Sequence, residues 1–384
     1  MPNILDYLDW RGDLSFRAAP FNEVDNLILA ELSFVDFSEL VPHGADIAEA
    51  PTLQTAAERY FREFSERSEA LGILVPREKI VSLLQKAAAS RRFAGLRLPD
   101  FVNAVDTERE MQFSALTAET EEGRLFIAFR GTDDTLVGWK EDLNMGHLMP
   151  VPAQTEALRY LTETAERYPR HRISVGGHSK GGNLSVYAAV SAKKSVRDRI
   201  DAVYNNDGPG FGTALIETAE HREMEGRIHT IVPESDLVGM MLGHEERYTV
   251  VKSSGSPLFQ HNGFTWQVLG DRFVYADDIS TEGRIAEGAM RGFAEGLTAE
   301  QREKFSEVLY ELLRASDAKT LSELEKDGFR TVTAMLRAHK ELDEESRELL
   351  RNAFRLLLRE NLRACGEQLP KVELPKRKRK SKEK

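Results

Sequence analysis

The 384-residue sequence predicts an α/β fold with a mostly parallel central sheet and helices on both of its faces. Short apolar runs, typical of buried strands, alternate with helical patterns through the middle of the chain. Before and after this part, apolar residues recur at helical spacing. We therefore expect an N-terminal helical region over 1–92 packed on an α/β core over 93–276, a helical appendage over 277–370 and a basic disordered tail over 371–384.

The first region is predicted to be helical because its apolar residues form stripes. Asn22 is a residue type that accepts hydrogen bonds from first-turn amides, and it precedes a stripe of Val24, Leu27 and Ile28. A second stripe lies between residues 57 and 64. We expect both stripes to pack in the core rather than to line a binding groove.

Strand patterns begin at Leu96. A helix over 158–168 separates the third strand from the fourth, which passes through Ile173 and Val175. The other predicted strands cover residues 96–105, 111–117, 125–129, 202–206, 228–232 and 247–251. Because the later strands are separated by helical patterns, their connections are crossovers that favour parallel pairing.

A glycine-rich turn follows the fourth strand and leads directly into a helix. Gly177, Ser179 and Gly181 give the pattern G-x-S-x-G, the nucleophile elbow of α/β-hydrolases. The serine of such an elbow has a strained backbone, and side chains two residues away on either side would collide with neighbouring elements. The turn also places the N–H of Lys180 at a helix N-terminus, where it could stabilise a developing oxyanion.

A serine nucleophile needs a base, and the base needs an acid that fixes its tautomer. In α/β-hydrolases the three residues follow one another as Ser, Asp or Glu, then His. Asp236 follows the strand over 228–232, and His261 follows the next strand, so we predict a triad of Ser179, Asp236 and His261. Asp207 also ends a strand, one strand earlier, and stays open as the alternative acid.

The loop after the third strand is expected to supply the second oxyanion donor. Thr132 in this loop follows Gly131, which permits close approach of the backbone. The oxyanion hole is therefore predicted to comprise the N–H groups of Thr132 and Lys180. No H-E-x-x-H pattern is present, so we predict no metal and no cofactor.

These motifs resemble those of the class 3 lipases in type, order and spacing. The matching residues are 127–132 (IAFRGT), Trp139, Asp142, 177–182 (GHSKGG), Ser235, Asp236 and 261–263 (HNG). The N-terminal stretch over 5–37 looks like the Mbeg1-like (DUF2974) group of bacterial proteins. The resemblance implies an α/β-hydrolase fold, the triad Ser179, Asp236 and His261, and oxyanion donors at Thr132 and Lys180.

One residue departs from the lipase pattern. Class 3 lipases usually carry an apolar residue where this chain has Lys180. We consider two explanations: the substrate has an anionic group, or Lys180 pairs with a nearby acid such as Asp207.

The composition of the chain indicates which partners the protein could bind and in which cellular compartment we expect it. The formal net charge of −11 argues against a specific nucleic-acid binder, which would need an excess of Lys and Arg. The single cysteine, Cys365, excludes an intrachain disulfide, and no run approaches the ~18 apolar residues of a membrane span. We expect a cytoplasmic protein whose basic tail is solvated or makes weak contact with a membrane surface.

The predicted function is that of a serine hydrolase that cleaves a carboxylic ester, and we expect a lipid or acyl ester. The alternative is a non-catalytic α/β-hydrolase scaffold that binds an acyl ligand or a protein partner, because a fold does not prove an activity. The sequence carries no prediction of the oligomeric state.

Overall fold

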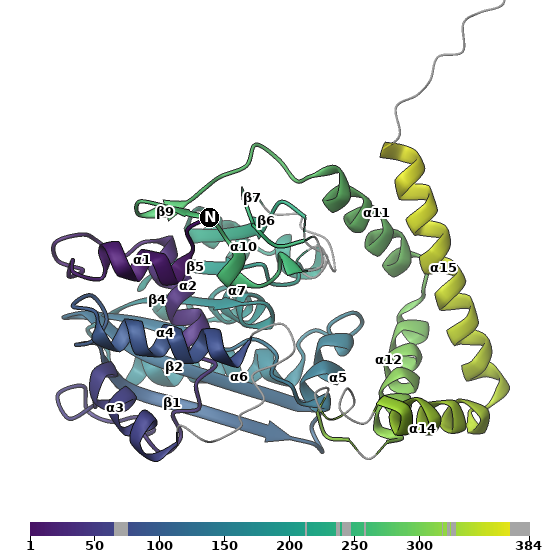
Figure 1. The fold of residues 1–384 in the computed structure, drawn as a ribbon, viewed down its shortest axis with the longest axis horizontal. Coiled ribbons are helices and arrows are strands. Elements are labelled where there is room, and N and C mark those ends of the chain that lie inside the picture. The colour runs from purple at the N-terminus through teal and green to yellow at the C-terminus, as the bar shows by residue number, and fades with distance from the viewer. Residues whose placement is uncertain are drawn as a thin grey trace, which may run out of the picture.

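The central element is a seven-stranded sheet in which each strand pairs with the next one along the chain (Figure 1). The computed structural model describes residues 1–64, 76–211, 213–235, 239, 247–256, 259–316, 318–320, 323 and 328–368. The strands are β1 (Arg97–Asp106), β2 (Met111–Glu121), β3 (Arg124–Phe129), β4 (Arg172–His178), β5 (Ile200–Asn206), β6 (Ile228–Pro233) and β7 (Tyr248–Val251). The strands predicted from the sequence are confirmed.

The sheet is mixed, with its parallel part on the side that carries the glycine-rich turn. Pairs β1/β2 and β2/β3 are antiparallel, and every pair from β3/β4 to β6/β7 is parallel. The antiparallel strands are joined by short turns that contain Glu110 and Gly123, both with positive φ. The prediction of a mostly parallel sheet with helices on both faces is therefore confirmed, with an antiparallel hairpin edge added to it.

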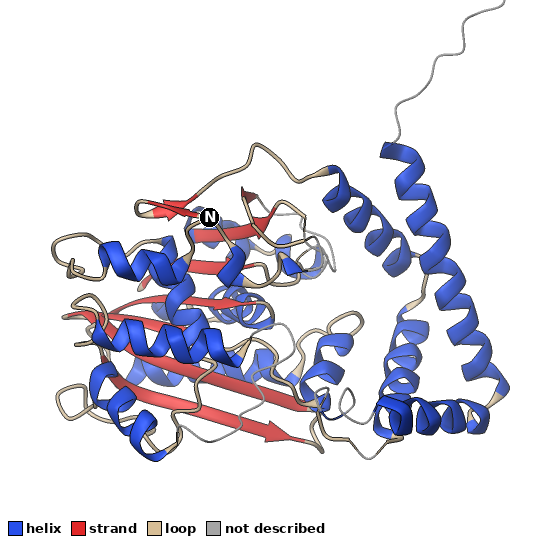
Figure 2. Cartoon of the chain, viewed as in Figure 1, coloured by secondary structure: helices blue, strands red, loops and turns tan. Residues whose placement is uncertain are grey.

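Helices cover both faces of the sheet, as Figure 2 shows. On strand β3, Phe126 and Ala128 face the N-terminal helices, whereas Ile127 and Phe129 face the opposite layer. The N-terminal layer contains α1 (Ile4–Arg11), α2 (Glu23–Leu32), α3 (Leu53–Glu63) and α4 (Arg77–Ala89), and the opposite layer contains α6 (Pro152–Arg167) and α7 (Lys180–Ser191). The alternation of side chains along a strand thus builds two cores.

Shorter elements surround these layers. They are α5 (Leu136–Asn144), α8 (Lys194–Arg197), α9 (Thr213–Ile216), α10 (Ala219–Met224), β8 (Val268–Leu269) and β9 (Arg272–Phe273). Helix α5 follows the loop after β3 and packs against β2 and the C-terminal helix α12.

Helix α2 is buried along its whole length from Val24 to Leu32 and packs on β4. Asn22 caps it as predicted, since its side chain accepts from the N–H groups of Val24 and Asp25. Not all of its buried residues are apolar, because Asp25, Asn26 and Glu31 are also fully enclosed. Buried polar groups need partners, so this helix connects to polar groups elsewhere in the chain.

Asp25 is paired with Arg92 inside the N-terminal layer. The Arg92 Nε donates to Asp25 Oδ1 at 2.6 Å, and neither side chain is exposed. Arg92 also donates to the carbonyl groups of Leu14, Ala19 and Pro20. One guanidinium thus fixes the loop between α1 and α2 to the end of α4.

The C-terminal helices lie to one side of the core (Figure 1). They are α11 (Thr281–Glu295), α12 (Ala299–Arg314), α14 (Gly328–Glu341) and α15 (Glu344–Gln368). Helix α12 meets α5 through a buried contact in which Lys140 Nζ lies 3.3 Å from Ser306 Oγ and Ser306 donates to Asn144 Oδ1 at 2.7 Å. The helical appendage is therefore attached to α5 by buried hydrogen bonds.

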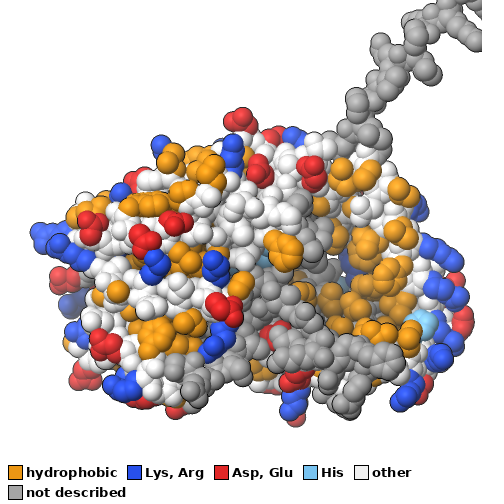
Figure 3. Space-filling view, viewed as in Figure 1, with side chains coloured by type: hydrophobic (Ala, Val, Ile, Leu, Met, Phe, Trp, Pro, Cys, Tyr) orange, Lys and Arg blue, Asp and Glu red, His pale blue; other side chains and the backbone are white. Residues whose placement is uncertain are grey.

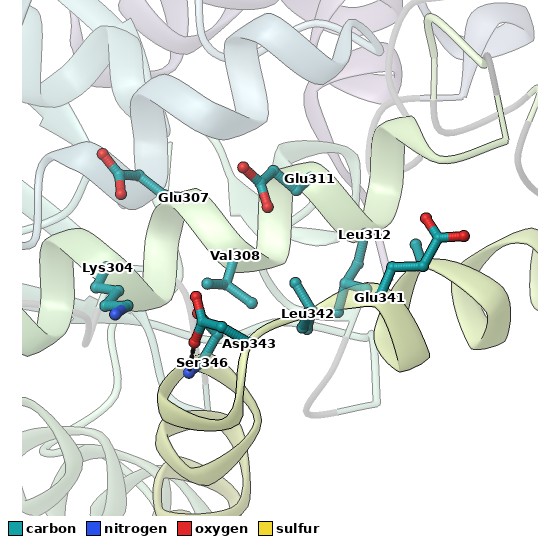
Figure 4. Close-up of a pocket in the computed structure, with 10 residues that line it drawn as sticks. Lys304, Glu307, Val308, Glu311, Leu312, Glu341, Leu342, Asp343 and Ser346 are labelled. Atoms are coloured by element: carbon teal, nitrogen blue, oxygen red, sulfur yellow. Dashed lines mark hydrogen bonds between the residues drawn. The ribbon is translucent and has the colours of Figure 1, made fainter.

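Between α12, α14 and the start of α15 lies a pocket with an acidic rim (Figure 4). Its floor includes Val308 and Leu312, which belong to a small core with Leu350. Glu307, Glu311, Glu341 and Asp343 are among the side chains around it.

Hydrophobic side chains gather over the C-terminal helices in the space-filling view (Figure 3). The exposed apolar residues of α14 and α15 are Val332, Leu336, Phe354, Leu358 and Leu362. Within the described residues, no helix combines the length and the apolar content that crossing a bilayer requires. The predicted basic tail over 371–384 lies outside the described residues.

The Arg92–Asp25 pair generates a stability prediction. Arg92→Met should lower the free energy of unfolding by about 3–5 kcal/mol, because it leaves a buried carboxylate without its cation. Urea denaturation of the variant and the parent measures this difference. Arg159→Met, which removes a half-exposed arginine on α6, is the control and should change the unfolding midpoint little. Equal losses for the two variants would contradict the prediction.

Candidate active site

Ser179 stands at the junction of β4 and α7 with a strained backbone. Its φ of 59° and ψ of −131° lie outside the regions that L-residues ordinarily adopt. A Cβ at Gly177 would lie 2.3 Å from the carbonyl carbon of Gly181, and one at Gly181 would lie 2.0 Å from the carbonyl oxygen of Phe129. Both glycines are thus required by close backbone contacts, and the turn has the geometry of a nucleophile elbow.

Polar contacts from β5 and α2 hold the elbow in this shape. The Ser179 N–H donates to the carbonyl oxygen of Asn206 at 2.9 Å. The Asn206 side chain in turn donates to the carbonyl oxygen of Gly177 at 2.9 Å and exchanges hydrogen bonds with the Asn26 side chain. The strained backbone of Ser179 is therefore held in place by hydrogen bonds that involve β5 and α2.

His261 is buried and is held by Asp207. The Nδ1 atom of His261 lies 2.8 Å from Oδ2 of Asp207, and both side chains are almost fully enclosed. An ionised carboxylate only accepts hydrogen bonds, so it places the proton of a neutral imidazole on Nδ1. The Nε2 atom of His261 then carries the lone pair that a general base needs.

The structure brings the alternative acid, Asp207, to His261. Asp207 follows β5, the direct neighbour of the elbow strand β4, and has a positive φ of 55°. Asp236, the acid preferred from the sequence, lies outside the described residues. The sequence signal for Asp207 is its position at the end of a strand before Gly-Pro-Gly. The usual arrangement, which places the acid after a later strand, favours Asp236, and that preference stays a prediction.

His178 holds the backbone of His261 from the other side. Its Nε2 lies 2.7 Å from the carbonyl oxygen of His261, and the two rings pack with centroids 4.7 Å apart. The Nδ1 of His178 lies 3.2 Å from Oε1 of Glu31 on α2. The sequence analysis did not identify Glu31 as a site residue, because the pattern of a helix does not indicate which distant side chain an acid on that helix will contact.

The loop after β3 lies against the elbow. A Cβ at Gly131 would be 2.7 Å from the carbonyl oxygen of His178 and 3.3 Å from Cβ of Ser179. Thr132 follows, and its hydroxyl donates to Oδ2 of Asp142 at 2.6 Å. Among the described residues, the backbone N–H groups of Thr132 and Lys180 donate to no protein acceptor, which leaves them available to an oxyanion.

The Lys180 side chain points away from this opening into the core. Its Nζ lies 3.1 Å from Oε2 of Glu141, 3.0 Å from the carbonyl oxygen of Gln112 and 2.6 Å from Oε1 of the same residue. Lys180 is 1% exposed. Its partner is therefore Glu141 and not Asp207. Because the cation points into the core, the explanation through an anionic substrate is wrong. The explanation through a nearby acid holds, with Glu141 as the acid.

Consecutive acids on α5 thus contact both predicted oxyanion residues. Glu141 pairs with Lys180 and also accepts from the backbone N–H groups of Gln112 and Ala153. Asp142 accepts from Thr132. Burial raises the pKa of Asp142 to about 6, while the nearby Lys180 charge and the Thr132 hydroxyl oppose the rise.

No metal centre is apparent in this region. In the described part of the chain, no group of His, Cys, Asp and Glu side chains could hold a metal ion.

A profile of the Mbeg1-like family matches residues 87–311. The chain belongs to the Mbeg1-like family. The match covers the whole sheet of this Mbeg1-like protein and extends through α11 into α12, the helix that packs on α5. No curated protein matches the sequence.

Solved lipase structures are among those similar to this Mbeg1-like protein. Lip2 lipase from Yarrowia lipolytica is 13% identical, with a TM-score of 0.33, over 60% of this chain and 80% of that one. A mutant of MDLA from Penicillium cyclopium is 12% identical, with a TM-score of 0.36, over 66% and 84%. The Rhizomucor miehei lipase propeptide complex is 15% identical, with a TM-score of 0.32, over 53% of this chain, which spans 66% of that one.

The Lys180–Glu141 pair generates the second prediction. Lys180→Met should lower the free energy of unfolding by about 3–5 kcal/mol, because it leaves the Glu141 carboxylate buried without a cation. Thermal or urea denaturation measures the loss. Lys194→Met is the matched control, since Lys194 is exposed and its removal should leave the unfolding midpoint nearly unchanged. An unaffected Lys180→Met variant would show that the buried cation does not hold α5 to the elbow.

Proposed function

We propose that this Mbeg1-like protein is a serine hydrolase that cleaves carboxylic esters, with Ser179 as nucleophile and His261 as general base. The observation that carries the proposal is the enclosed contact between His261 Nδ1 and Asp207 Oδ2, where Asp207 follows the strand paired with the one that ends just before the strained Ser179. A histidine that only forms a surface salt bridge would be exposed, and its presence would not explain the strained backbone of Ser179.

The reaction follows the steps of acyl transfer. His261 Nε2 takes the hydroxyl proton of Ser179 while Oγ attacks the acyl carbon, and the carbonyl oxygen gains the negative charge. The N–H groups of Thr132 and Lys180 stabilise that oxyanion. The imidazolium then gives its proton to the departing alcohol, and water hydrolyses the acyl-enzyme by the same route, which restores Ser179 and releases the acid.

Asp207 is proposed as the acid of the triad. Its support is the 2.8 Å contact with His261 and a position on the strand beside the elbow strand. Asp236 stays the alternative predicted from the sequence. In either case the acid fixes the tautomer of His261 and stabilises the imidazolium that forms during the reaction.

The substrate class is inferred from the lipase-like motifs, and a lipid or acyl ester fits them best. Because the Lys180 cation forms a buried ion pair with Glu141, we do not expect this residue to make the protein selective for an anionic ester. The cytoplasmic location and the weak membrane contact of the tail stay predictions.

Labelling with a fluorophosphonate tests the proposal. The activated Ser179 Oγ should attack phosphorus and displace fluoride, so the parent should label, Ser179→Ala should not, and His261→Ala should label at least about 100-fold more slowly. Asp207→Asn should slow labelling strongly, whereas Asp236→Asn should change it little. Circular dichroism of each variant verifies folding.

The outcomes separate the alternatives. Strong loss in Asp236→Asn with no loss in Asp207→Asn would return the acid role to Asp236. A folded parent that does not label would contradict the hydrolase proposal and favour the non-catalytic scaffold that binds an acyl ligand or a protein partner.

A further inference from the structure

A buried carboxyl group lies behind the candidate base and has no role in the reaction described above. Both oxygens of Glu31 are enclosed, and among the described residues neither has a hydrogen-bond partner; His178 Nδ1 lies 3.2 Å from Oε1. A Cβ at Gly263 would lie 2.8 Å from Glu31 Oε1, so the loop that carries His261 packs directly on this carboxyl group.

The carbonyl oxygen of His261 determines the protonation of His178. A carbonyl oxygen only accepts hydrogen bonds, so His178 Nε2, at 2.7 Å, must be the donor. In a neutral His178 ring, Nδ1 then carries a lone pair and lies 3.2 Å from Glu31 Oε1. A carboxylate so close to that lone pair would be repulsive, so either Glu31 or His178 must carry one further proton.

The surroundings favour a proton at this position. Burial raises the pKa of Glu31 to about 8, and only the charge of His261 opposes the rise. The titratable groups that face the carboxyl are His178 from β4 and His261 from its loop, with Asp207 behind His261. Because no Lys or Arg of the described residues pairs with Glu31, an ionised Glu31 would be costly at neutral pH.

From these contacts we infer that Glu31 and His178 are a positioning pair for His261, in which one shared proton keeps His178 donating to the His261 carbonyl oxygen. The pair fixes the backbone of His261, while Asp207 fixes its imidazole. Because an apolar side chain of similar size would fill the space without the cost of burying a carboxyl group, the acid is explained by the proton that it supplies. The inference rests on the proposed function of His261.

Two substitutions at Glu31 separate a proton donor from a space filler. Glu31→Gln keeps a donor toward His178 Nδ1, whereas Glu31→Leu removes it. In the full-length protein we expect the fluorophosphonate labelling rate at saturation to stay within about threefold of the parent for Glu31→Gln and to fall about tenfold for Glu31→Leu. The probe concentration for half-saturation should not change, because the pair does not touch the ligand.

The pH profile gives a readout that packing alone would not change. The parent should lose labelling rate as the pH rises through about 8, where Glu31 gives up its proton, and Glu31→Gln should lack this loss. Glu23→Gln on the same helix is the matched control. Glu23 accepts from Tyr275 and Phe273, and its substitution should leave the profile unchanged.

Thermal stability tests the proton without any need for activity. The unfolded chain ionises Glu31 near its ordinary value of 4.5, while the folded chain holds the proton up to about 8. The folded parent should therefore lose stability as the pH rises from about 5 to 8. The melting temperature of Glu31→Gln, relative to that of the parent, should rise across this range.

Each outcome decides the inference. Equal labelling rates for Glu31→Leu and Glu31→Gln, or a melting-temperature difference that does not depend on pH, would overturn it. If Glu31→Leu does not fold, His178→Gln takes its place and should slow labelling without changing half-saturation. A parent that never labels would refute the proposed hydrolase, and the melting-temperature series would still decide whether Glu31 holds the proton.

Discussion

The close approach of backbones at the elbow is the constraint on which the site depends. The Cα of Gly181 is so near the end of β3 that no side chain fits between them, and Gly177 is equally confined. This proximity gives Ser179 its strained φ and brings the loop of Gly131 and Thr132 alongside it. Ser179 and the two predicted oxyanion donors are therefore placed by a single packing requirement, at the carboxyl ends of adjacent parallel strands.

Buried acidic residues then fix the groups that surround this turn. Asp207 orients the ring of His261, Glu141 neutralises Lys180, and Glu31 lies behind His178. Each acid comes from a different element, so the elbow is tied to β5, α5 and α2 at once. Enclosed ion pairs contribute little net stability over apolar packing, but they penalise every arrangement that separates the partners. Their effect here is to make one geometry of the site much more favourable than its alternatives.

Local patterns in the sequence predicted the strands, the elbow glycines and the loop position of His261, because these features depend on spacing and backbone sterics. Pairings between distant elements were harder to predict. Asp207 ranks below Asp236 in the sequence because the usual arrangement places the acid after a later strand, whereas the contact of Asp207 with His261 becomes visible only in the fold. The role of Glu31 could not be predicted from the sequence, because the pattern of α2 is that of an ordinary core helix. Only the fold shows that His178 lies against this carboxyl group.

Helix α5 connects the C-terminal appendage to the oxyanion loop. Within one stretch of this helix, Lys140 and Asn144 contact Ser306 of α12, while Glu141 and Asp142 hold the two predicted oxyanion residues. Successive helical residues point in different directions, so one short helix can meet both partners at the same time. Since these residues share one turn of helix, α12 and the two predicted oxyanion residues are connected through α5. The packing of the appendage on α5 thus contributes to the geometry of the site, and the family match likewise extends beyond the sheet into α12.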